Sequence, residues 1–192
     1  MSLLRSKAGL RSAAIAAREG LSPEQRRAAA QAVAARGLPF AVAHGAVVAG
    51  YAPIRSEFDP MPLLRRLADA GARLALPVIT GREQPLQFRS FSIGQPLERG
   101  PLGIRQPTVA SAQLVPEILL VPLAAFDRSG HRIGYGAGYY DRSIEALRGG
   151  NRTVAVGLAF AVQEIDAVPA LPHDAVLDYV LTETQTFDFR SS

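Results

Sequence analysis

A glycine-rich segment at residues 126–142, FDRSGHRIGYGAGYYDR, holds the densest group of residues able to do chemistry. Three glycines alternate with a tyrosine and an alanine at positions 134–138. Glycine reaches positive φ angles at little cost, and without a Cβ it lets successive backbone N–H groups approach an anion. An arginine precedes these glycines and an aspartate follows them, so the segment predicts a site for an anionic ligand.

The elements expected on either side place these glycines between a strand and a helix. Residues 118–123 (ILLVPL) are short, apolar and branched, and residues 139–148 place Ile144 and Leu147 at helical spacing. A helix that begins at about Tyr139 adds its free N–H groups and its dipole to an anion site. The spacing matches neither GxxxxGK(S/T) nor GxGxxG, so a flexible turn is the alternative interpretation.

A second group of polar residues follows a strand predicted at residues 46–51. Glu57 and Asp59 lie in the loop between this strand and a helix predicted over residues 60–70. Loops at the ends of strands carry ligand contacts in open α/β sheets, so both carboxylates are candidates to hold a polar substrate. In the alternative interpretation, Asp59 only caps the following helix and Glu57 is solvated.

Histidines and one lysine complete the candidates. His173 and Asp174 are adjacent near the end of the chain, where a locally hydrogen-bonded turn is the alternative to a ligand site. His44 and His131 have no metal-ligand spacing with His173, so we expect them to be structural or on the surface. Lys7 is the single lysine among many arginines, either because a compact ammonium suits a phosphate there or by chance near the terminus.

Two helices are expected at the start of the chain, over residues 3–19 and 23–36. Ser22 and Pro23 supply an N-cap and a first-turn proline for the second helix. Residues 1–18 carry four basic residues and no acid, which is typical of an organellar presequence as well as of a mature helix. We expect a cytoplasmic protein and leave organellar import open.

Length and composition favour a single domain over residues 1–192. The chain is 48% apolar and 20% charged, as globular proteins are, and no apolar run approaches the roughly 18 residues that span a bilayer. Because it has no cysteine, disulfides, thiolate chemistry and Cys-bound metals are excluded. The net charge of +4 comes from scattered arginines without a basic run, so we expect no nucleic-acid partner. We also expect no membrane partner and a monomer.

The remaining strands indicate the fold class. Strands are predicted at residues 73–78, 153–160 and 179–182, and residues 86–91 alternate as an edge strand does. Residues 92–110 are rich in glycine and proline, so we expect an irregular surface crossing. Strands that alternate with helices predict an α/β fold: a mainly parallel central sheet with helices on both faces, in a three-layer, Rossmann-like α/β/α arrangement.

Four segments, spread over most of the chain, resemble those of the 5-formyltetrahydrofolate cyclo-ligase family. Residues 126–142 are similar to its signature FDxxGxRLGxGxGYYDR, with Ile133 in place of leucine. Residues 172–183 are similar to PxHDxxLDxVLTE. Lys7–Arg11 matches KxxLR, and Ser56–Pro60 is similar to an acidic loop of the form GE(I/L)DT. The first two motifs are specific.

The resemblance implies an ATP- and Mg²⁺-dependent enzyme that cyclises 5-formyltetrahydrofolate to 5,10-methenyltetrahydrofolate and releases ADP and phosphate. It further implies that the formyl oxygen is phosphorylated first, after which the neighbouring nitrogen attacks and phosphate departs. Residues 103–107 are GIRQP where the family usually has GIxEP, which leaves open a relative acting on another pterin or small metabolite. A non-catalytic nucleotide-binding module is the third hypothesis.

The resemblance also implies individual roles. The residues expected to bind ATP are Lys7, Arg11, Arg132, Ile133, Gly134, Tyr135, Gly136, Ala137, Gly138, Tyr139 and Tyr140, the last of which packs inward as core in the alternative interpretation. The residues expected to bind the reduced folate are Ile54, Glu57, Asp59, Tyr135, Gly136, Ala137, Gly138 and Tyr139. Catalytic roles fall on Lys7, Arg132 and Tyr139. Asp141 and Asp174 are the expected ligands of Mg²⁺, which selects hard oxygen donors.

Overall fold

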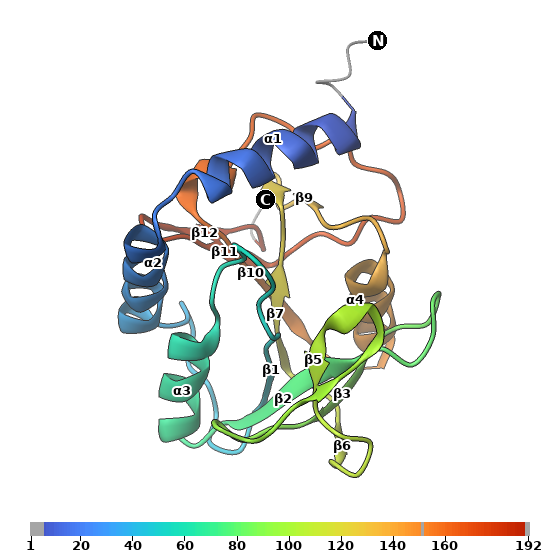
Figure 1. Ribbon diagram of the computed structural model, residues 1–192. Coiled ribbons are helices and arrows are strands. Elements are labelled where there is room, and N and C mark those ends of the chain that lie inside the picture. The colour runs from blue at the N-terminus through green and yellow to red at the C-terminus, as the bar shows by residue number, and fades with distance from the viewer. Residues whose placement is uncertain (1–5, 151, 191–192) are drawn as a thin grey trace.

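Figure 1 shows a computed structural model in which an eight-stranded sheet runs through the molecule; the structure describes residues 6–150 and 152–190. The central strands are parallel, in the order β11 (Tyr179–Leu181), β10 (Val154–Leu158), β7 (Ile118–Pro122), β1 (Val47–Ala49) and β2 (Arg73–Val78). Antiparallel strands extend both edges: β12 (Thr186–Asp188) beside β11, and β3 (Gln87–Ser90) then β6 (Gln113–Leu114) beside β2. The predicted mainly parallel sheet is confirmed.

Helices cover both faces of this sheet, so the three-layer prediction is confirmed. One face carries α2 (Pro23–Arg36) and α3 (Met61–Asp69), and the other carries α4 (Tyr139–Gly150) (Figure 1). The side chains of β7 alternate between the layers, with Leu120 in the core under α2 and α3 and Val121 in the core under α4. This strand is apolar throughout because a sheet covered on both faces has no solvated side.

The first helix, α1 (Lys7–Glu19), belongs to neither layer and lies across one end of the sheet (Figure 1). It packs through Ala14 and Leu10 onto the hairpin of β8 (Ala125–Phe126) and β9 (Arg132–Ile133), which follows the carboxyl end of β7. The predicted helix began at residue 3, but residues 3–5 lie outside the described residues. This docking brings the start of the chain to the glycine-rich segment.

Most predicted elements are confirmed, and the differences have simple causes. Residues 86–91 form an inner strand rather than an edge, because β6 pairs with the outer side of β3. The crossing at residues 92–110 contains a short ladder of β4 (Glu98–Arg99) and β5 (Arg105–Gln106) around a 3-10 turn at Pro101–Gly103. Two-residue strands of this kind have no periodicity that a sequence could reveal. Among the described residues, no helix has the length and apolar character to cross a membrane.

A buried carboxylate fixes the turn that opens the glycine-rich segment. Asp127 Oδ1 accepts hydrogen bonds from the N–H groups of Ser129 at 2.9 Å and His131 at 3.1 Å. Its Oδ2 accepts from the N–H of Val168 at 2.8 Å, which ties the β8–β9 hairpin to the loop after β10. Asp127 is thus a structural residue of the hairpin on which α1 rests.

We therefore expect Asp127→Asn to lower the free energy of unfolding by about 1–3 kcal/mol, because an amide nitrogen would face the N–H of Val168 and leave a buried donor unpaired. Urea denaturation followed by circular dichroism measures the change. The matched control is Asp166→Asn, since Asp166 is an exposed aspartate of the same loop. Equal stability of the two variants would contradict the structural role of Asp127.

Candidate active site

A cleft of about 760 Å³ lies where α1, the loop after β1 and the glycine-rich segment meet. Its walls come from stretches that are far apart in the sequence: the start of α1, residues 51–57, the β4–β5 ladder, residues 132–142 and residues 171–174. Every residue that the sequence predicted for the site lines this cleft except Asp59. Parallel strands end at a common edge, which is why loops after β1 and β7 come together here.

The glycine-rich segment presents free backbone donors. Gly136 and Gly138 have φ angles of 95° and 68°, in the left-handed region that favours glycine, and α4 begins directly afterwards at Tyr139, as predicted. Within the described part of the chain, no residue accepts a hydrogen bond from the N–H groups of residues 134–138. A row of free N–H groups that runs into a helix N-terminus is suited to an anion.

Two guanidinium groups hold this segment by its carbonyl oxygens. Arg11 Nε donates to the carbonyl of Gly134 at 2.7 Å, and Arg142 donates to the carbonyl of Ala137 at 2.8 Å. The C=O and N–H of a trans peptide point in opposite directions, so the N–H groups of these two peptides face away from the arginines. The arginines therefore fix the orientation of the free donors.

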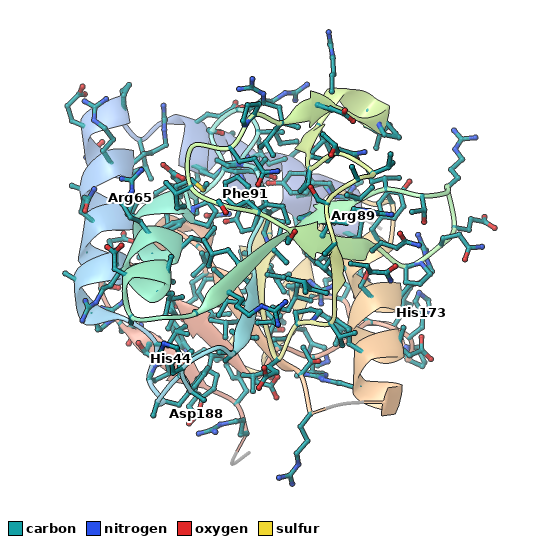
Figure 2. All side chains as sticks on the ribbon, turned by 90° about the horizontal axis from the view of Figure 1, so that it is seen from below. His44, Arg65, Arg89, Phe91, His173 and Asp188 are labelled. Carbon is teal, nitrogen blue, oxygen red and sulfur yellow. The ribbon has the colours of Figure 1, made fainter. Side chains whose placement is uncertain are left out.

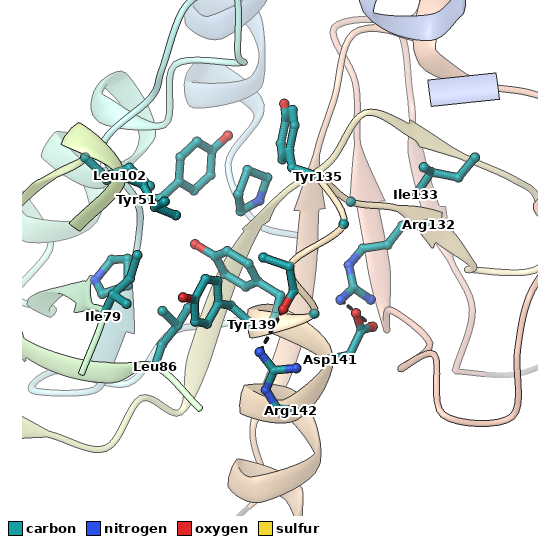
Figure 3. A pocket seen from close by; sticks show the side chains of 18 of the residues that line it. Tyr51, Ile79, Leu86, Leu102, Arg132, Ile133, Tyr135, Tyr139, Asp141 and Arg142 are labelled. Carbon is teal, nitrogen blue, oxygen red and sulfur yellow. Dashed lines mark hydrogen bonds and ion pairs between the residues drawn. The ribbon is translucent and has the colours of Figure 1, made fainter. Parts of the chain in front are cut away.

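Two ion pairs form one wall of the cleft. Arg132 donates to Asp141 at 2.8 Å, drawn as a dashed line in Figure 3, and Lys7 donates to Asp174. Burial lowers the pKa of the Arg132 guanidinium, although the charge of Asp141 opposes the shift. Burial would raise the pKa of Asp174, but hydrogen bonds from Lys7 and from the N–H of Leu171 bring this pKa below its usual value. The carboxylate of Asp174 is therefore charged at neutral pH.

The same two carboxylates fit a divalent cation. Protein donors reach only Oδ1 of Asp141 and Oδ2 of Asp174 among the described residues, so each keeps one free oxygen. They are neighbours in space, because the N–H of Ala175 donates to Asp141 at 3.1 Å. No group of three or more His, Asp or Glu in the described ranges could hold a metal alone, so a cation here would take further ligands from a bound molecule or water.

The two carboxylates of the acidic loop lie in different environments. Glu57 lines the cleft and is only 8% exposed, so the alternative that it is solvated is wrong. Its Oε2 accepts from the N–H of Ile54 at 2.8 Å, and burial raises its pKa. Asp59 is exposed, and it accepts from the N–H of Met61, the first residue of α3, at 2.9 Å, although Pro60 occupies the N-cap position.

The wall opposite the ion pairs is aromatic and apolar. In Figure 3, Tyr51, Ile79, Leu86 and Leu102 lie on one side of the open space, and the Arg132–Asp141 pair lies on the other. Tyr135 and Tyr139 stand between the two sides (Figure 3). The cleft thus has one half suited to a flat apolar ring and one half suited to anions.

Two buried tyrosines of the cleft, Tyr51 and Tyr140, remain neutral. Burial raises the pKa of Tyr51 and of Tyr140, and the charge of Glu57 adds to both shifts. Tyr140 packs against the core under α4, as the alternative interpretation has it, and it also lines the cleft. These phenols can donate hydrogen bonds at neutral pH but cannot act as bases.

Sequence reasoning missed Arg18 and the apolar half of the cleft. Arg18 lies on the same face of α1 as Lys7 and Arg11, because spacings of four and seven residues return to one face of a helix. That spacing was the available signal for Arg18. The apolar side chains Ile79, Leu86 and Leu102 have no such signal, because most residues of these types form core. Figure 2 shows His44 and His173 at separate places on the molecule, as expected from their spacing.

Comparison with known proteins agrees with this geometry. A sequence profile of the 5-formyltetrahydrofolate cyclo-ligase family matches residues 4–183. The chain belongs to this family. A cyclo-ligase from Mycolicibacterium smegmatis is 35% identical over 191 residues, which cover 93% of this chain and 94% of that relative. A cyclo-ligase from Escherichia coli strain K12 is 31% identical over 180 residues, which cover 90% of this chain and 97% of that relative.

A solved structure supports the same family. The NMR structure of Aquifex aeolicus 5,10-methenyltetrahydrofolate synthetase superposes with a TM-score of 0.77 at 29% identity, covering 97% of this chain and 94% of the other. The protein is therefore an enzyme of the ligase class with a folate-related function. All four cyclo-ligase segments found in the sequence contribute residues to the cleft.

The ion pair of this cyclo-ligase cleft gives a pH prediction. Lys7→Met removes a hydrogen bond and a positive charge from Asp174, while burial remains, so we expect the pKa of Asp174 to rise. NMR titration of the aspartate carboxyl carbons measures it. Because the wild-type pKa lies below that of an unfolded aspartate, about 3.9, the pair stabilises the wild type above this pH. This advantage disappears as the pH falls through the folded-state pKa.

Arg27→Met is the control for this titration, since Arg27 belongs to an exposed ion pair with Glu24 elsewhere on the surface. It should leave the Asp174 titration unchanged. An Asp174 pKa that is the same in Lys7→Met and wild type would show that the ion pair does not form in solution.

Proposed function

We propose that this protein catalyses the ATP- and Mg²⁺-dependent cyclisation of 5-formyltetrahydrofolate to 5,10-methenyltetrahydrofolate, with release of ADP and phosphate. The observation that carries this proposal is the division of one cleft into an aromatic, apolar half and a half with free backbone N–H groups and cations. A pterin ring and a triphosphate bound in these halves would meet near Tyr135 and Tyr139.

The phosphate half is proposed to bind ATP. The free N–H groups of residues 134–138 and the first turn of α4 would bind phosphate oxygens. Lys7, Arg11 and Arg132 reach the same region and would neutralise the phosphate charge. Phosphoryl transfer needs mainly positioning and charge neutralisation, which is what these groups supply.

The apolar half is proposed to bind the folate. Ile54, Tyr135 and Tyr139 offer surface for the ring, and the Glu57 carboxylate would accept hydrogen bonds from a ring N–H and an exocyclic amine. The exposed Asp59 would act only through the loop that holds Glu57 in place. Gly136 and Gly138 would allow the substrate to approach the backbone closely.

Asp141 and Asp174 are proposed to hold Mg²⁺ through their free oxygens. Such an ion supplies neutralisation of the charge on phosphate oxygens. Lys7 and Arg132 are already in contact with these carboxylates, so they are placed to bind the same phosphate groups.

The proposed chemistry is a phosphorylation followed by ring closure. The formyl oxygen attacks the γ-phosphorus and ADP leaves, which gives a phosphorylated formyl group. The neighbouring secondary nitrogen then attacks the activated carbon, the C–O bond breaks as phosphate departs, and the nitrogen releases its proton. The chain would hold the two reacting groups together, and the buried phenols of Tyr51 and Tyr140 would stay neutral during the reaction.

One substitution favours a second candidate function, in which the protein acts on another pterin. Gln106 lines the cleft at the position where the family usually has glutamate, and its Oε1 lies 3.4 Å from the backbone nitrogen of Ile79. A neutral amide there removes one charged acceptor from the substrate half, which would change the pattern of ring donors that the cleft prefers.

One assay tests the proposed function. Purified protein is mixed with 5-formyltetrahydrofolate, ATP and Mg²⁺, and the near-ultraviolet band of methenyltetrahydrofolate is followed. Formation of product only with ATP present is the expected result. ATP binding without product from this folate would favour the second candidate, and binding without turnover of any pterin would indicate a non-catalytic nucleotide-binding module.

Asp174→Asn tests the proposed metal ligands. We expect the Mg²⁺ concentration that gives half-maximal rate to rise by about ten-fold or more, because an amide oxygen carries no charge for a hard cation. The control is Glu164→Gln, which removes a carboxylate that pairs with Arg128 outside the cleft. An unchanged Mg²⁺ titration in Asp174→Asn would assign this aspartate to structure alone.

A further inference from the structure

A buried arginine joins three parts of the site without lining the cleft. Arg18 of α1 is 2% exposed, although charged side chains are almost never buried unless they are paired. Its Nε donates to Ser56 Oγ in the acidic loop at 3.1 Å, and its Nη1 donates to the hydroxyl of Tyr135 in the glycine-rich segment at 2.7 Å. Arg18 therefore links α1 to both halves of the cleft.

The direction of these hydrogen bonds points to Glu57. Because the Tyr135 oxygen accepts from Arg18, its own proton is free to be donated. Ser56, the other acceptor of Arg18, directly precedes Glu57 in the chain, and Glu57 and Tyr135 both line the cleft, so we assign the Glu57 carboxylate as the acceptor of this proton. Burial raises the pKa of Glu57, and the N–H of Ile54, the Tyr135 hydroxyl and the charge of Arg18 all oppose this rise.

Ionisable groups face Glu57 from every element around it. They are Arg18 from α1, Tyr51 from the end of β1, Tyr135 from the glycine-rich segment and Tyr140 from α4. Of these, Arg18 supplies the positive charge that stabilises a carboxylate, and the tyrosines are neutral. The charged form of Glu57 is thus favoured first by the N–H of Ile54, and then by the Tyr135 hydroxyl and the charge of Arg18.

We propose that Arg18 is a positioning residue that acts through Tyr135 and Ser56 to hold the Glu57 carboxylate, in its charged form and in one orientation, against the substrate half of the cleft. A carboxylate fixed in this way selects heterocycles that present N–H donors over those that present acceptors. The identity of the heterocycle as a reduced folate rests on the proposed function, whereas the network itself does not.

The family signature does not require this network. Position 135 is one of the open positions of FDxxGxRLGxGxGYYDR, and position 18 lies outside KxxLR. A side chain without a hydroxyl at position 135 would satisfy the signature and would leave Arg18 without this acceptor. Tyr135 therefore determines specificity at a position that the motif does not constrain.

The first test uses the ligand-free protein, so that it does not depend on the reaction. The pKa of Glu57 is measured by NMR titration of the glutamate carboxyl carbons in wild type and Tyr135→Phe. We expect it to rise in the variant, because a hydrogen bond to the charged form is lost while burial stays. Tyr179→Phe is the matched control, since the Tyr179 hydroxyl is buried with no hydrogen-bond partner among the described residues.

Arg18→Lys and the double variant test whether Arg18 acts through Tyr135. In Arg18→Lys the positive charge remains, but the planar fork that reaches two acceptors is lost. We therefore expect the Glu57 pKa to rise less in Arg18→Lys than in Tyr135→Phe. In the double variant Arg18→Lys/Tyr135→Phe, the rise in the Glu57 pKa should be smaller than the sum of the two single rises, because both substitutions act on the same hydroxyl. If Arg18 were purely structural, Arg18→Lys would lower the thermal stability and leave the Glu57 titration unchanged. That result would overturn the proposal.

The second test measures binding of 5-formyltetrahydrofolate by calorimetry between pH 5 and 8. The affinity should fall as the pH drops and Glu57 becomes protonated, and Tyr135→Phe should bind about ten-fold more weakly, with the fall beginning at higher pH. Wild-type protein that binds this folate but does not convert it would contradict the proposed function and leave the network intact. Equal Glu57 titrations in wild type and Tyr135→Phe would overturn the network even in an active enzyme.

Discussion

Parallel pairing of the central strands is the constraint on which the rest of the structure depends. Parallel strands end at one edge of a sheet, so the acidic loop after β1 and the glycine-rich segment after β7 reach the same edge. Each strand is buried on both faces, and side chains there serve packing alone. The polar residues of the site therefore come from outside these central strands: from the loops at that edge, the short β-ladders, α1 and the start of α4.

The charges at this edge form pairs that desolvation makes necessary. Arg18 and Arg132 are both buried, and each has oxygen acceptors close by. Removing one partner of a buried pair lowers the free energy of unfolding by more than the intact pair adds to it, because the remaining group is left desolvated and unpaired. The same pairs that complete the cleft thus also link its loops to α1 and to the β8–β9 hairpin.

The sequence was sufficient for local features and insufficient for contacts between distant segments. The helix at Pro23–Arg36 was predicted because its N-cap, its proline and its length can be recognised from neighbouring residues alone. The turn before Tyr139 was predicted because only glycine adopts its φ angles readily. Arg18 was missed because its partners lie 38 and 117 residues away. The inner position of β3 was missed because its outer neighbour, β6, is a strand of only two residues, which has no recognisable pattern in the sequence.

The docking of α1 has a consequence for the stability of the site. The helix packs in a small cluster around Ala14 that is separate from the two cores of the sheet. Segments with few buried apolar contacts open locally at a lower free energy than the whole protein unfolds. Such an opening would withdraw Lys7, Arg11 and Arg18 together while the sheet stays folded. Loss of activity on heating would then begin with the opening of a cooperative unit smaller than the one that sets the melting temperature.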